Sequence, residues 1–286
     1  MAQLGVLYVA FGAPYLSMAL ISAASVRATN PQAQLCILTN VTGAYPAVDW
    51  WVPSRGDLWI YMKEPTKQNR SVKTALHRHS PFENTLFLDC DTIVRKNFST
   101  IGILLDYFDI VLKTGEDGPD RKRALLNGAL AYGETVHFNS GVIGFRKNSA
   151  TEEFFSLWHA MFQERGKSRD QPSLVEALCA SRVRLFPLHS KWNHGDYWYL
   201  PRPSREGIGI WHYKARGMDH RIEKLLRQSV HWFGGDKAAS DEVEKFILRR
   251  RSQRKNWTIR NIRKTLAREL GGPLSNFSIS NGGDTI

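Results

Sequence analysis

Cysteine is scarce in this chain, whose 286 residues include only Cys36, Cys90 and Cys179. The three lie far apart in apolar surroundings, and neither a Cys-x-x-Cys pair nor a zinc-binding spacing occurs. These absences exclude a disulfide-stabilised secreted fold and a zinc-ribbon type of domain. We therefore expect three reduced thiols in a cytoplasmic protein.

Long hydrophobic runs are also missing. No segment reaches the roughly 18 apolar residues that a transmembrane helix requires. The N-terminal run GVLYVAFG (Gly5–Gly12) is shorter than that, and no cluster of basic residues precedes it. We therefore expect a first strand there rather than a signal peptide.

Acidic residues are absent from one long segment of this basic chain. The net charge is +12, and Lys245–Arg268 contributes ten Lys and Arg without any Asp or Glu. The rest of the chain holds 29 basic and 27 acidic residues, which is close to balance. The basic character therefore belongs to a C-terminal tail, residues 241–286, which we separate from a main domain of residues 1–240.

Apolar runs alternate with helical patterns along the main domain, which predicts an α/β fold with a largely parallel sheet. The expected strands are Leu4–Phe11, Gln34–Thr39, Val48–Val52, Thr85–Asp89, Ile110–Leu112, His137–Phe145, Val183–Phe186 and Ile208–His212. The expected helices are an amphipathic Tyr15–Ala28, Gln68–His79, Ile101–Tyr107, Glu152–Arg165 and Asp170–Ala180.

The segment TLFLDCDTIV (Thr85–Val94) ends a buried run with Asp89 and Asp91. Residues at i and i+2 of a strand share one face, and the carboxyl end of a strand borders the ligand crevice of α/β folds. Two carboxylates there suit Mg²⁺ or Mn²⁺. The alternative is a strand end with two solvated acids.

Two chemistries share this pattern. In one, the metal holds the diphosphate of a nucleotide sugar and stabilises it as a leaving group. In the other, Asp89 is the nucleophile of a phosphatase of the haloacid-dehalogenase type. Asp236 and Asp241 resemble the late acidic motif of that second family.

Two polar pairs lie in or next to otherwise apolar elements. Asn139 and Ser140 can bind hydroxyl groups, and Gly141 suggests a close approach of backbone or ligand, although a plain β-bulge explains the same pattern. Asp170 and Gln171 at a helix start can also bind sugar hydroxyls, although Asp170 alone is a good N-cap.

Cationic and imidazole groups accompany the acidic pair. Arg70 and Lys73, at i and i+3 of a helix, suit a diphosphate or form a solvated face. His212 follows a short apolar strand and is a good third ligand for Mn²⁺, or a structural histidine. Lys214 and Arg216 follow it and can neutralise phosphate charge.

The order of these motifs resembles that of the GT-A glycosyltransferases, above all the retaining, glycogenin-like and galactosyltransferase-like family. The resemblance runs from about residue 4 to residue 216 and rests on VLYVAFGAPYLSMALISAASVRATNP, RSVKTAL, TLFLDCDTIV, FNSGVIGF, DQPSL and WHYK. It implies a single Rossmann-like mixed sheet flanked by helices, a nucleotide-diphosphate sugar donor (usually a UDP-sugar), Mn²⁺ or Mg²⁺, and a hexose transferred with retention.

The resemblance also assigns roles to residues. It implies a metal held by Asp89, Asp91 and His212. It implies a donor held at the base and ribose by Phe11 and Gly12, at the nucleotide or its phosphates by Arg70 and Lys73, and at the sugar by Asn139, Ser140 and Asp170. Gln171 would lie beside the reacting carbon.

One departure from the family concerns the phosphate-binding lysine. The family often has His followed by Gly and then by Lys-Pro-Trp, whereas this chain has His212-Tyr213-Lys214-Ala215-Arg216-Gly217. The lysine role therefore falls to Lys214, with Arg216 as its substitute. The phosphatase alternative leaves Asn139, Asp170 and His212 unexplained. A third possibility is a nucleotide-sugar-binding protein that has lost turnover.

The acceptor and the tail are predicted from composition. Gly115–Arg123 and the aromatic segment His189–Tyr199 are candidates for a glycan or lipid-linked acceptor, the second being otherwise a packed loop. Ser252–Leu270 can form a basic amphipathic helix that docks on an anionic membrane, or a solvated helix. We do not expect a nucleic-acid partner, because no recognition fold accompanies the basic tract.

Overall fold

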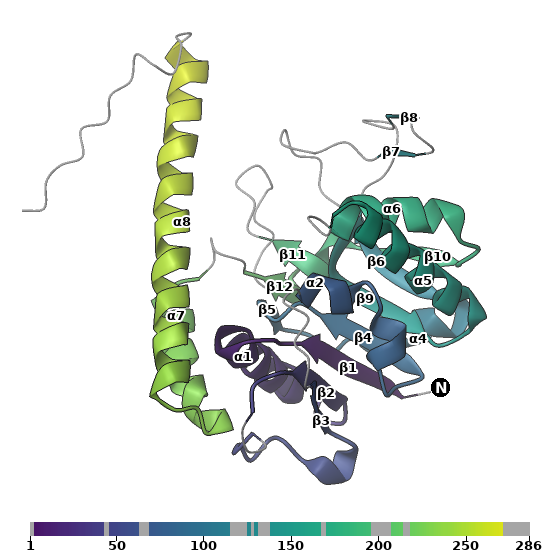
Figure 1. Cartoon of the computed structure of the whole chain (residues 1–286), viewed down its shortest axis with the longest axis horizontal. Coiled ribbons are helices and arrows are strands. Elements are labelled where there is room, and N and C mark those ends of the chain that lie inside the picture. Colours follow the sequence, from purple (N-terminus) through teal and green to yellow (C-terminus); the bar gives the residue numbers. More distant parts are fainter. Residues whose placement is uncertain are drawn as a thin grey trace, which may run out of the picture.

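The fold is built on a central sheet of seven strands (Figure 1). The computed structural model describes residues 3–42, 46–62, 69–114, 125–126, 129–130, 138–166, 170–195, 207–213 and 218–270. The strand order is β10 (Leu185–Leu188), β6 (Ile110–Thr114), β9 (Phe138–Arg146), β4 (Asn84–Leu88), β1 (Leu4–Val9), β2 (Gln34–Thr39) and β3 (Leu58–Tyr61).

The sheet is mixed, and one strand accounts for this. β1 pairs in parallel with β2 and β4, and β2 with β3, while β10 pairs in parallel with β6. β9 lies antiparallel between β4 and β6. The carboxyl ends of the parallel strands and the amino end of β9 therefore meet at one edge, which we call the carboxyl edge.

Alternation along β1 separates two cores, one on each face of the sheet. Val6 and Tyr8 belong to one hydrophobic cluster and Leu7 and Val9 to the other. The first face is covered by α1 (Ala13–Thr29), α4 (Ser99–Tyr107), α7 (His220–Ser229) and the start of α8 (Lys237–Leu270). The second is covered by α2 (Asn69–Lys73), α3 (Leu76–His79), α5 (Ser149–Glu164) and α6 (Asp170–Ala180).

A small sheet lies beside the large one. Its strands are β11 (His194–Gly195), β12 (Ile210–His212) and β5 (Thr92–Val94), with β5 antiparallel to β12. A further pair, β7 (Leu125–Leu126) and β8 (Ala129–Leu130), forms a two-stranded ribbon, and short 3₁₀ turns occur at Pro53–Arg55, Ser190–Asn193 and Val230–Phe233. The small sheet extends the carboxyl edge of the large one at Asp89.

Most predicted elements are confirmed to within a few residues, and three predictions are wrong. Val48–Val52 is not a strand, because its tryptophans pack edge-to-face against Trp232 and Trp59. The strand at that side of the sheet is β3. The helix expected over Gln68–His79 is broken between α2 and α3.

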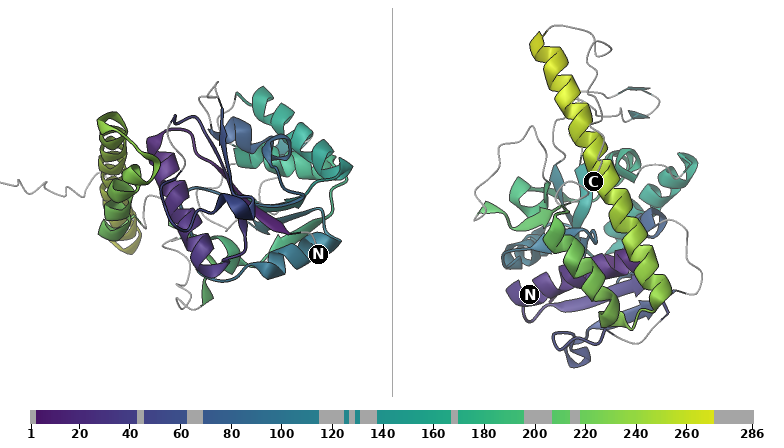
Figure 2. Two further views of the ribbon diagram at one scale, coloured as in Figure 1. Left: turned by 90° about the horizontal axis from the view of Figure 1, so that it is seen from below. Right: turned by 90° about the vertical axis from the view of Figure 1, so that its left-hand side faces the viewer.

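The first helix, α1, was expected to be amphipathic, and this is also wrong. Most of its residues are buried, including Ser17 and Ser22. The sheet covers one side of α1, and α7 and α8 cover the other (Figure 2). A helix covered on both sides needs no polar face.

The predicted basic helix is part of α8, a single helix that begins at Lys237 (Figure 1). Its first turns bury Val243, Phe246 and Ile247 in the same core as the sheet. The boundary at residue 240 stays a prediction, and α8 runs across it. None of the described helices combines the length and the apolar character that crossing a bilayer would require.

Candidate active site

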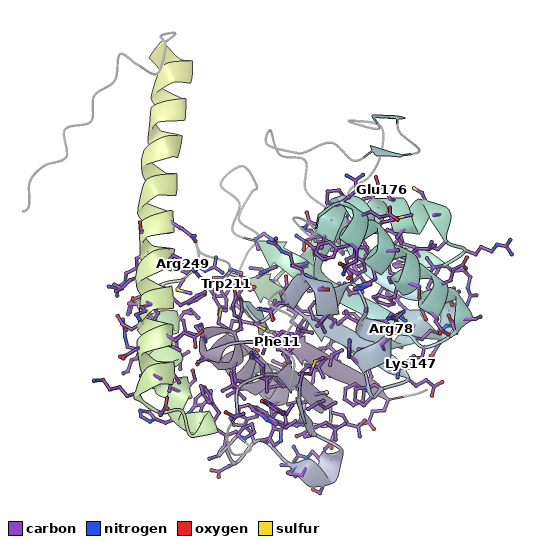
Figure 3. All side chains as sticks on the ribbon, viewed as in Figure 1. Phe11, Arg78, Lys147, Glu176, Trp211 and Arg249 are labelled. Atoms are coloured by element: carbon purple, nitrogen blue, oxygen red, sulfur yellow. The ribbon has the colours of Figure 1, made fainter. Side chains whose placement is uncertain are left out.

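Polar side chains collect at the carboxyl edge of the sheet. Phe11 and Gly12 follow β1, Asp89 follows β4, and Asn139 is the second residue of β9. Figure 3 shows Phe11 and Trp211 on this side of the molecule and Lys147 at the opposite edge. The predicted site residues that the structure describes therefore come from segments far apart in the sequence.

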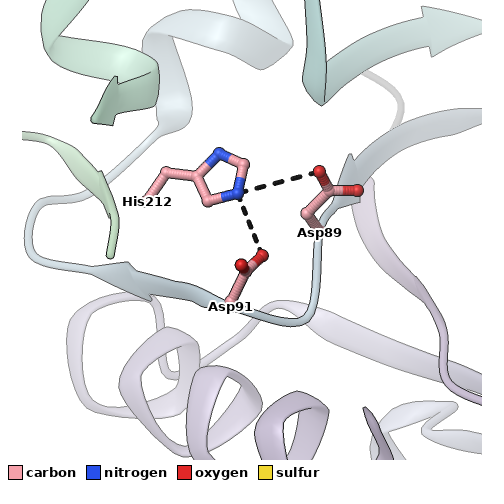
Figure 4. A group of neighbouring side chains, drawn as sticks. All are labelled: Asp89, Asp91 and His212. Carbon is pink, nitrogen blue, oxygen red and sulfur yellow. Dashed lines mark hydrogen bonds and ion pairs between the residues drawn. The ribbon is translucent and has the colours of Figure 1, made fainter. Parts of the chain in front are cut away.

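Asp89, Asp91 and His212 converge at this edge (Figure 4). The His212 Nε2 atom lies 2.9 Å from Asp91 Oδ1 and 3.8 Å from Asp89 Oδ2. One ligand atom from each residue can be chosen so that all three lie within 4.8 Å of one another. The His212 side chain is only 5% exposed, against 28% for Asp89 and 17% for Asp91.

Pairing between two short strands brings His212 to the acidic pair. In the register of β5 and β12, His212 lies opposite Thr92. The Tyr213 N–H donates to the Asp91 carbonyl at 3.1 Å, which continues the ladder to the turn between the aspartates. The turn itself is held by the Thr92 hydroxyl, which donates to the Asp89 carbonyl at 2.8 Å. Backbone hydrogen bonds therefore hold His212 next to Asp91, although 121 positions separate the two residues in the sequence.

The three side chains fit a hard or borderline divalent cation. Two carboxylates and one imidazole are ligands that Mn²⁺ and Mg²⁺ accept, and protein ligands on one side leave other positions for phosphate oxygens. The two carboxylates are partly exposed, so a ligand can reach them from solvent. The predicted metal ligands are thus brought together.

The Asn139-Ser140-Gly141 turn is both a bulge and part of the site. The β6–β9 register jumps here from the Leu112–Ile143 pair to the Lys113–Asn139 pair. A Cβ on Gly141 would lie 2.7 Å from the His212 ring. Gly141 was expected to allow a close approach of backbone or ligand, and the group that approaches it is instead the His212 side chain.

Lys73 is a buried cation rather than part of a solvated helix face. Its ammonium lies 2.8 Å from Asp89 Oδ1 and 3.6 Å from Asp170 Oδ2. Burial alone would lower the pKa of Lys73, but the two carboxylates raise it overall, so the side chain is charged. Lys73 therefore connects Asp89, a predicted metal ligand, with Asp170, the predicted sugar-binding residue. Arg70, one turn earlier, is exposed.

Asp170 begins α6, and its side chain points to other elements rather than capping the helix. Its Oδ2 accepts a hydrogen bond from the Ser140 hydroxyl at 2.6 Å. Burial favours the neutral acid, yet the Lys73 charge and the Ser140 hydrogen bond lower the pKa of Asp170 overall. The carboxylate is therefore ionised and fixed in direction. Gln171, the next residue, is exposed.

Two asparagines that were not among the predicted site residues hold the end of β1. The Phe11 N–H donates to Asn69 Oδ1 at 3.1 Å, and the Gly12 N–H donates to Asn40 Oδ1 at 2.8 Å. The Phe11 side chain packs in the core, so Phe11 offers its backbone to this edge. Gly12 has a φ of 89°, and a Cβ there would lie 3.1 Å from Glu242 Oε1 of α8.

Some predicted residues lie outside the described part of the chain. They include Lys214, Arg216 and the loop Gly115–Arg123. Of the aromatic segment His189–Tyr199, the structure describes the first seven residues, and there Trp192 is buried in the core. The packed-loop alternative is therefore right for Trp192.

The phosphatase alternative finds no support in the geometry. Asp236, offered as its late acidic motif, accepts a hydrogen bond from the Ala239 N–H at 3.0 Å at the start of α8. It is a helix-capping residue. Asp89 is paired with Lys73 and faces His212.

Comparison with known proteins gives consistent matches. A profile of the nucleotide-diphospho-sugar transferase family matches residues 83–232. The galactosyltransferase LgtC, solved in complex with donor and acceptor sugar analogues, aligns with a TM-score of 0.54 at 13% identity, covering 83% of this chain and 99% of that chain.

A second solved structure has the same fold. The glycosyltransferase GlyE of Streptococcus pneumoniae aligns with a TM-score of 0.53 at 12% identity, covering 87% of this chain and 64% of that chain. The comparison with curated protein sequences gives no match. At such identities the solved structures establish the fold alone, and the predicted GT-A fold is confirmed.

Proposed function

Because this chain belongs to the nucleotide-diphospho-sugar transferase family and is a glycosyltransferase, we propose that it transfers a hexose from a UDP-sugar to a glycan or lipid-linked glycan, with Mn²⁺ or Mg²⁺. The observation that carries the proposal is the convergence of Asp89, Asp91 and His212 at the carboxyl edge. LgtC was crystallised with donor and acceptor sugar analogues, which supports a glycan acceptor by analogy of fold.

In this proposal Asp89, Asp91 and His212 hold the divalent cation. These residues would hold Mn²⁺ or Mg²⁺, which would supply positive charge to the departing diphosphate and could lower the barrier by several kcal/mol. Lys214, or Arg216 in its place, adds positive charge at the phosphates. Phe11 and Gly12 border the base and ribose, and Arg70 adds positive charge at the nucleotide or its phosphates.

The sugar of the donor is oriented by Asp170, Asn139 and Ser140. The Asp170 carboxylate is ionised and held by the Ser140 hydroxyl, so its second oxygen can accept hydrogen bonds from sugar hydroxyls. Asn139 uses its oxygen within the protein, accepting from Gly141 N and Asn193 Nδ2 at 2.8 Å each. Its amide nitrogen is the group it can offer to the sugar.

We propose retention of the anomeric configuration, with Gln171 beside the reacting carbon. The sugar develops positive charge as the diphosphate leaves. Asp89 and Asp170 are both engaged by Lys73, and Asp91 faces His212, so none of these carboxylates is placed as a free nucleophile. Attack on the front face, with the Gln171 amide next to the acceptor, is consistent with this arrangement.

A nucleotide-sugar screen tests the donor. We expect UDP-hexoses to raise the melting temperature of the purified chain in the presence of Mn²⁺, and UDP to be released slowly by hydrolysis. GDP- and ADP-hexoses at the same concentration are the matched controls. Equal stabilisation by all nucleotides, with or without metal, would contradict the proposal. Product NMR with the preferred donor then reports the anomeric configuration.

The tail supports a second part of the proposal, namely docking on the anionic inner face of the membrane by a cytoplasmic enzyme. α8 continues well beyond the core residues Val243–Ile247, as one helix that carries the basic segment (Figure 1). Each basic residue near such a surface contributes about 1 kcal/mol. Sedimentation with phosphatidylserine vesicles should carry down the full chain, whereas neutral vesicles should not. Equal sedimentation with both would contradict an electrostatic docking.

A further inference from the structure

A buried asparagine lies directly behind the metal-site histidine. Asn193, from the turn Ser190–Asn193, is 1% exposed, and His212 is 4% exposed. The His212 Nδ1 atom lies 3.0 Å from Asn193 Oδ1, and Asn193 Nδ2 lies 2.8 Å from Asn139 Oδ1. Asn139 Oδ1 also accepts from the Gly141 N–H at 2.8 Å. Four groups therefore form one continuous line of hydrogen bonds.

The donors in this line can be assigned from chemistry. The Gly141 N–H is a fixed backbone donor, so the Asn139 atom that it meets is an oxygen. That oxygen only accepts, so the Asn193 atom facing it is the NH₂ group. The Asn193 oxygen is consequently the atom that faces His212, and since it only accepts, His212 must carry a proton on Nδ1.

This assignment determines what the other ring nitrogen can do. A neutral imidazole has one N–H and one lone pair, so a proton held at Nδ1 leaves the lone pair on Nε2. Nε2 is the atom that lies 2.9 Å from Asp91 Oδ1 and 3.8 Å from Asp89 Oδ2. A cation bound between His212 and the two carboxylates would therefore meet the Nε2 lone pair, which is the arrangement that a metal ligand requires.

We propose that Asn193 is a positioning residue, which holds the proton of His212 on Nδ1 and so directs the Nε2 lone pair to the cation. The inference rests on the proposed metal in the proposed function. It adds to the proposed metal ligands a residue that acts on the metal only through His212. It also gives Asn139 a second role, because the Asn139 oxygen orients the amide of Asn193.

A purely structural role for Asn193 makes a different prediction. If Asn193 only satisfies buried polar groups, its loss should lower stability without changing the tautomer of His212. Asn30 is a matched control, because it is also buried and uses both ends of its amide, accepting from Phe98 N and donating to Thr29 Oγ1. It lies at the far end of α1, away from the carboxyl edge.

The test compares Asn193→Leu, Asn193→Ala and Asn30→Leu with the wild type, each as the full chain. Nitrogen-15 NMR of the metal-free protein at alkaline pH reports which ring nitrogen of His212 carries the proton, with His212→Gln used to assign the signal. Electron paramagnetic resonance of free Mn²⁺ then gives the dissociation constant for the metal alone, without donor.

We expect the Nδ1–H tautomer in the wild type and in Asn30→Leu, and a shift to Nε2–H in both Asn193 variants. Mn²⁺ binding should weaken by about 10- to 100-fold in the Asn193 variants and stay unchanged in Asn30→Leu. An unchanged tautomer in either folded Asn193 variant would overturn the inference. A wild type that binds no Mn²⁺ would instead overturn the proposed metal, and the tautomer of the metal-free protein would still decide the role of Asn193.

Discussion

Two clusters of buried charge lie at opposite edges of the same sheet. At the amino edge, Asp109 precedes β6 and accepts six hydrogen bonds, from Arg146, Asn148 and Arg184. At the carboxyl edge, Asp89, Asp91 and Asp170 converge, and Lys73 is the cation of the described residues that lies within 4 Å of them, besides His212. Among the described residues, the cluster at the amino edge has two arginines for one acid, and the cluster at the carboxyl edge has three acids for one lysine and an imidazole.

The difference separates a structural cluster from a functional one. Both oxygens of Asp109 are saturated by protein donors, so nothing remains for a ligand. At the other edge the carboxylates outnumber the described cations, and two of them, Asp89 and Asp91, are partly exposed to solvent. Grouped carboxylates repel one another and lose solvation, which destabilises the fold, and a bound cation would offset this destabilisation. In the described part of the chain, the excess of carboxylates over cations therefore distinguishes the site, more than burial itself.

The largest effect should come from exchanging one carboxylate for its neutral isostere in each cluster. Asp91→Asn removes a metal ligand, and we expect turnover of donor to fall by about 10²- to 10³-fold, because charge stabilisation of the leaving group is lost. Asp109→Asn should keep full turnover per folded molecule and lower the free energy of unfolding by about 2 kcal/mol, as hydrogen bonds to a charged group are weakened.

The two readouts for this pair are donor hydrolysis with Mn²⁺ and denaturant unfolding. Each variant serves as the control of the other. Full metal-dependent activity in Asp91→Asn would remove Asp91 from the metal site. A turnover defect in folded Asp109→Asn would mean that the amino edge takes part in catalysis, and the contrast between the two edges would fail.

Two glycines of one strand allow a finer comparison within β9. A methyl group at Gly141 would lie 2.7 Å from the His212 ring, whereas one at Gly144 would lie 2.4 Å from a Val111 methyl. Both alanine variants should lose about 1–3 kcal/mol of stability through overpacking. Gly141→Ala alone should weaken Mn²⁺ binding, by about tenfold, since the imidazole is displaced. Equal Mn²⁺ affinities in the two variants would indicate that the ring can move without consequence.

The stability of the protein at low pH should depend on Asp109 and the hydrogen bonds that it accepts. Burial alone would raise the pKa of Asp109, but hydrogen bonds from Arg184 and Arg146 hold it well below its usual range. A carboxyl group with a depressed pKa contributes stability above its unfolded pKa of about 4 and loses it as the pH falls through the folded value. Wild-type stability should therefore decline below about pH 4, and Asp109→Asn should decline less steeply. Parallel declines in urea titrations across this range would contradict the assignment.

Those parts of the fold could be predicted in which a short stretch of sequence determines its own structure. The strands β1 and β2 and the face shared by Asp89 and Asp91 follow from apolar runs and from the two-residue period of a strand. The strand predicted at Val48–Val52 is wrong because its tryptophans pack within a loop. An apolar run in the sequence does not show whether the residues pack in a strand or in a loop. The missed strand β3 lies at the edge of the sheet, with Leu58 and Tyr61 partly exposed.

Site residues could be predicted where their chemical type suggests a role. They could not be predicted where the role depends on a contact with a residue distant in the sequence. Asp89, Asp91 and His212 were predicted as metal ligands from their residue types and from the order of the neighbouring motifs. Asn193 has no local signal, because one asparagine in a loop is ordinary until the pairing of β11 with β12 places it beside His212. The burial of Lys73 was missed for a similar reason, since its helix has a polar sequence and its partners come from β4 and α6.

The smallest effect concerns Cys90, which lies between Asp89 and Asp91 in sequence and yet belongs to the closed core. Its thiol donates to the Val9 carbonyl, and burial, followed by the charges of the two aspartates, raises its pKa well above the usual value. Burial raises the pKa of Cys36 to about 12, whereas Cys179 is exposed, contrary to its expected apolar setting.

Iodoacetamide at pH near 8 should therefore modify Cys179 alone in the folded protein, with the other two at least about 10²-fold slower, since the thiolate is the reactive form. Peptide mapping after graded exposure measures the three rates. Adding Mn²⁺ should leave the Cys90 rate unchanged, because the thiol faces the core while the carboxylates on either side of it face the crevice. A Cys90 rate equal to that of Cys179, or one that Mn²⁺ suppresses, would place the thiol in the site and show that the turn between the aspartates is open.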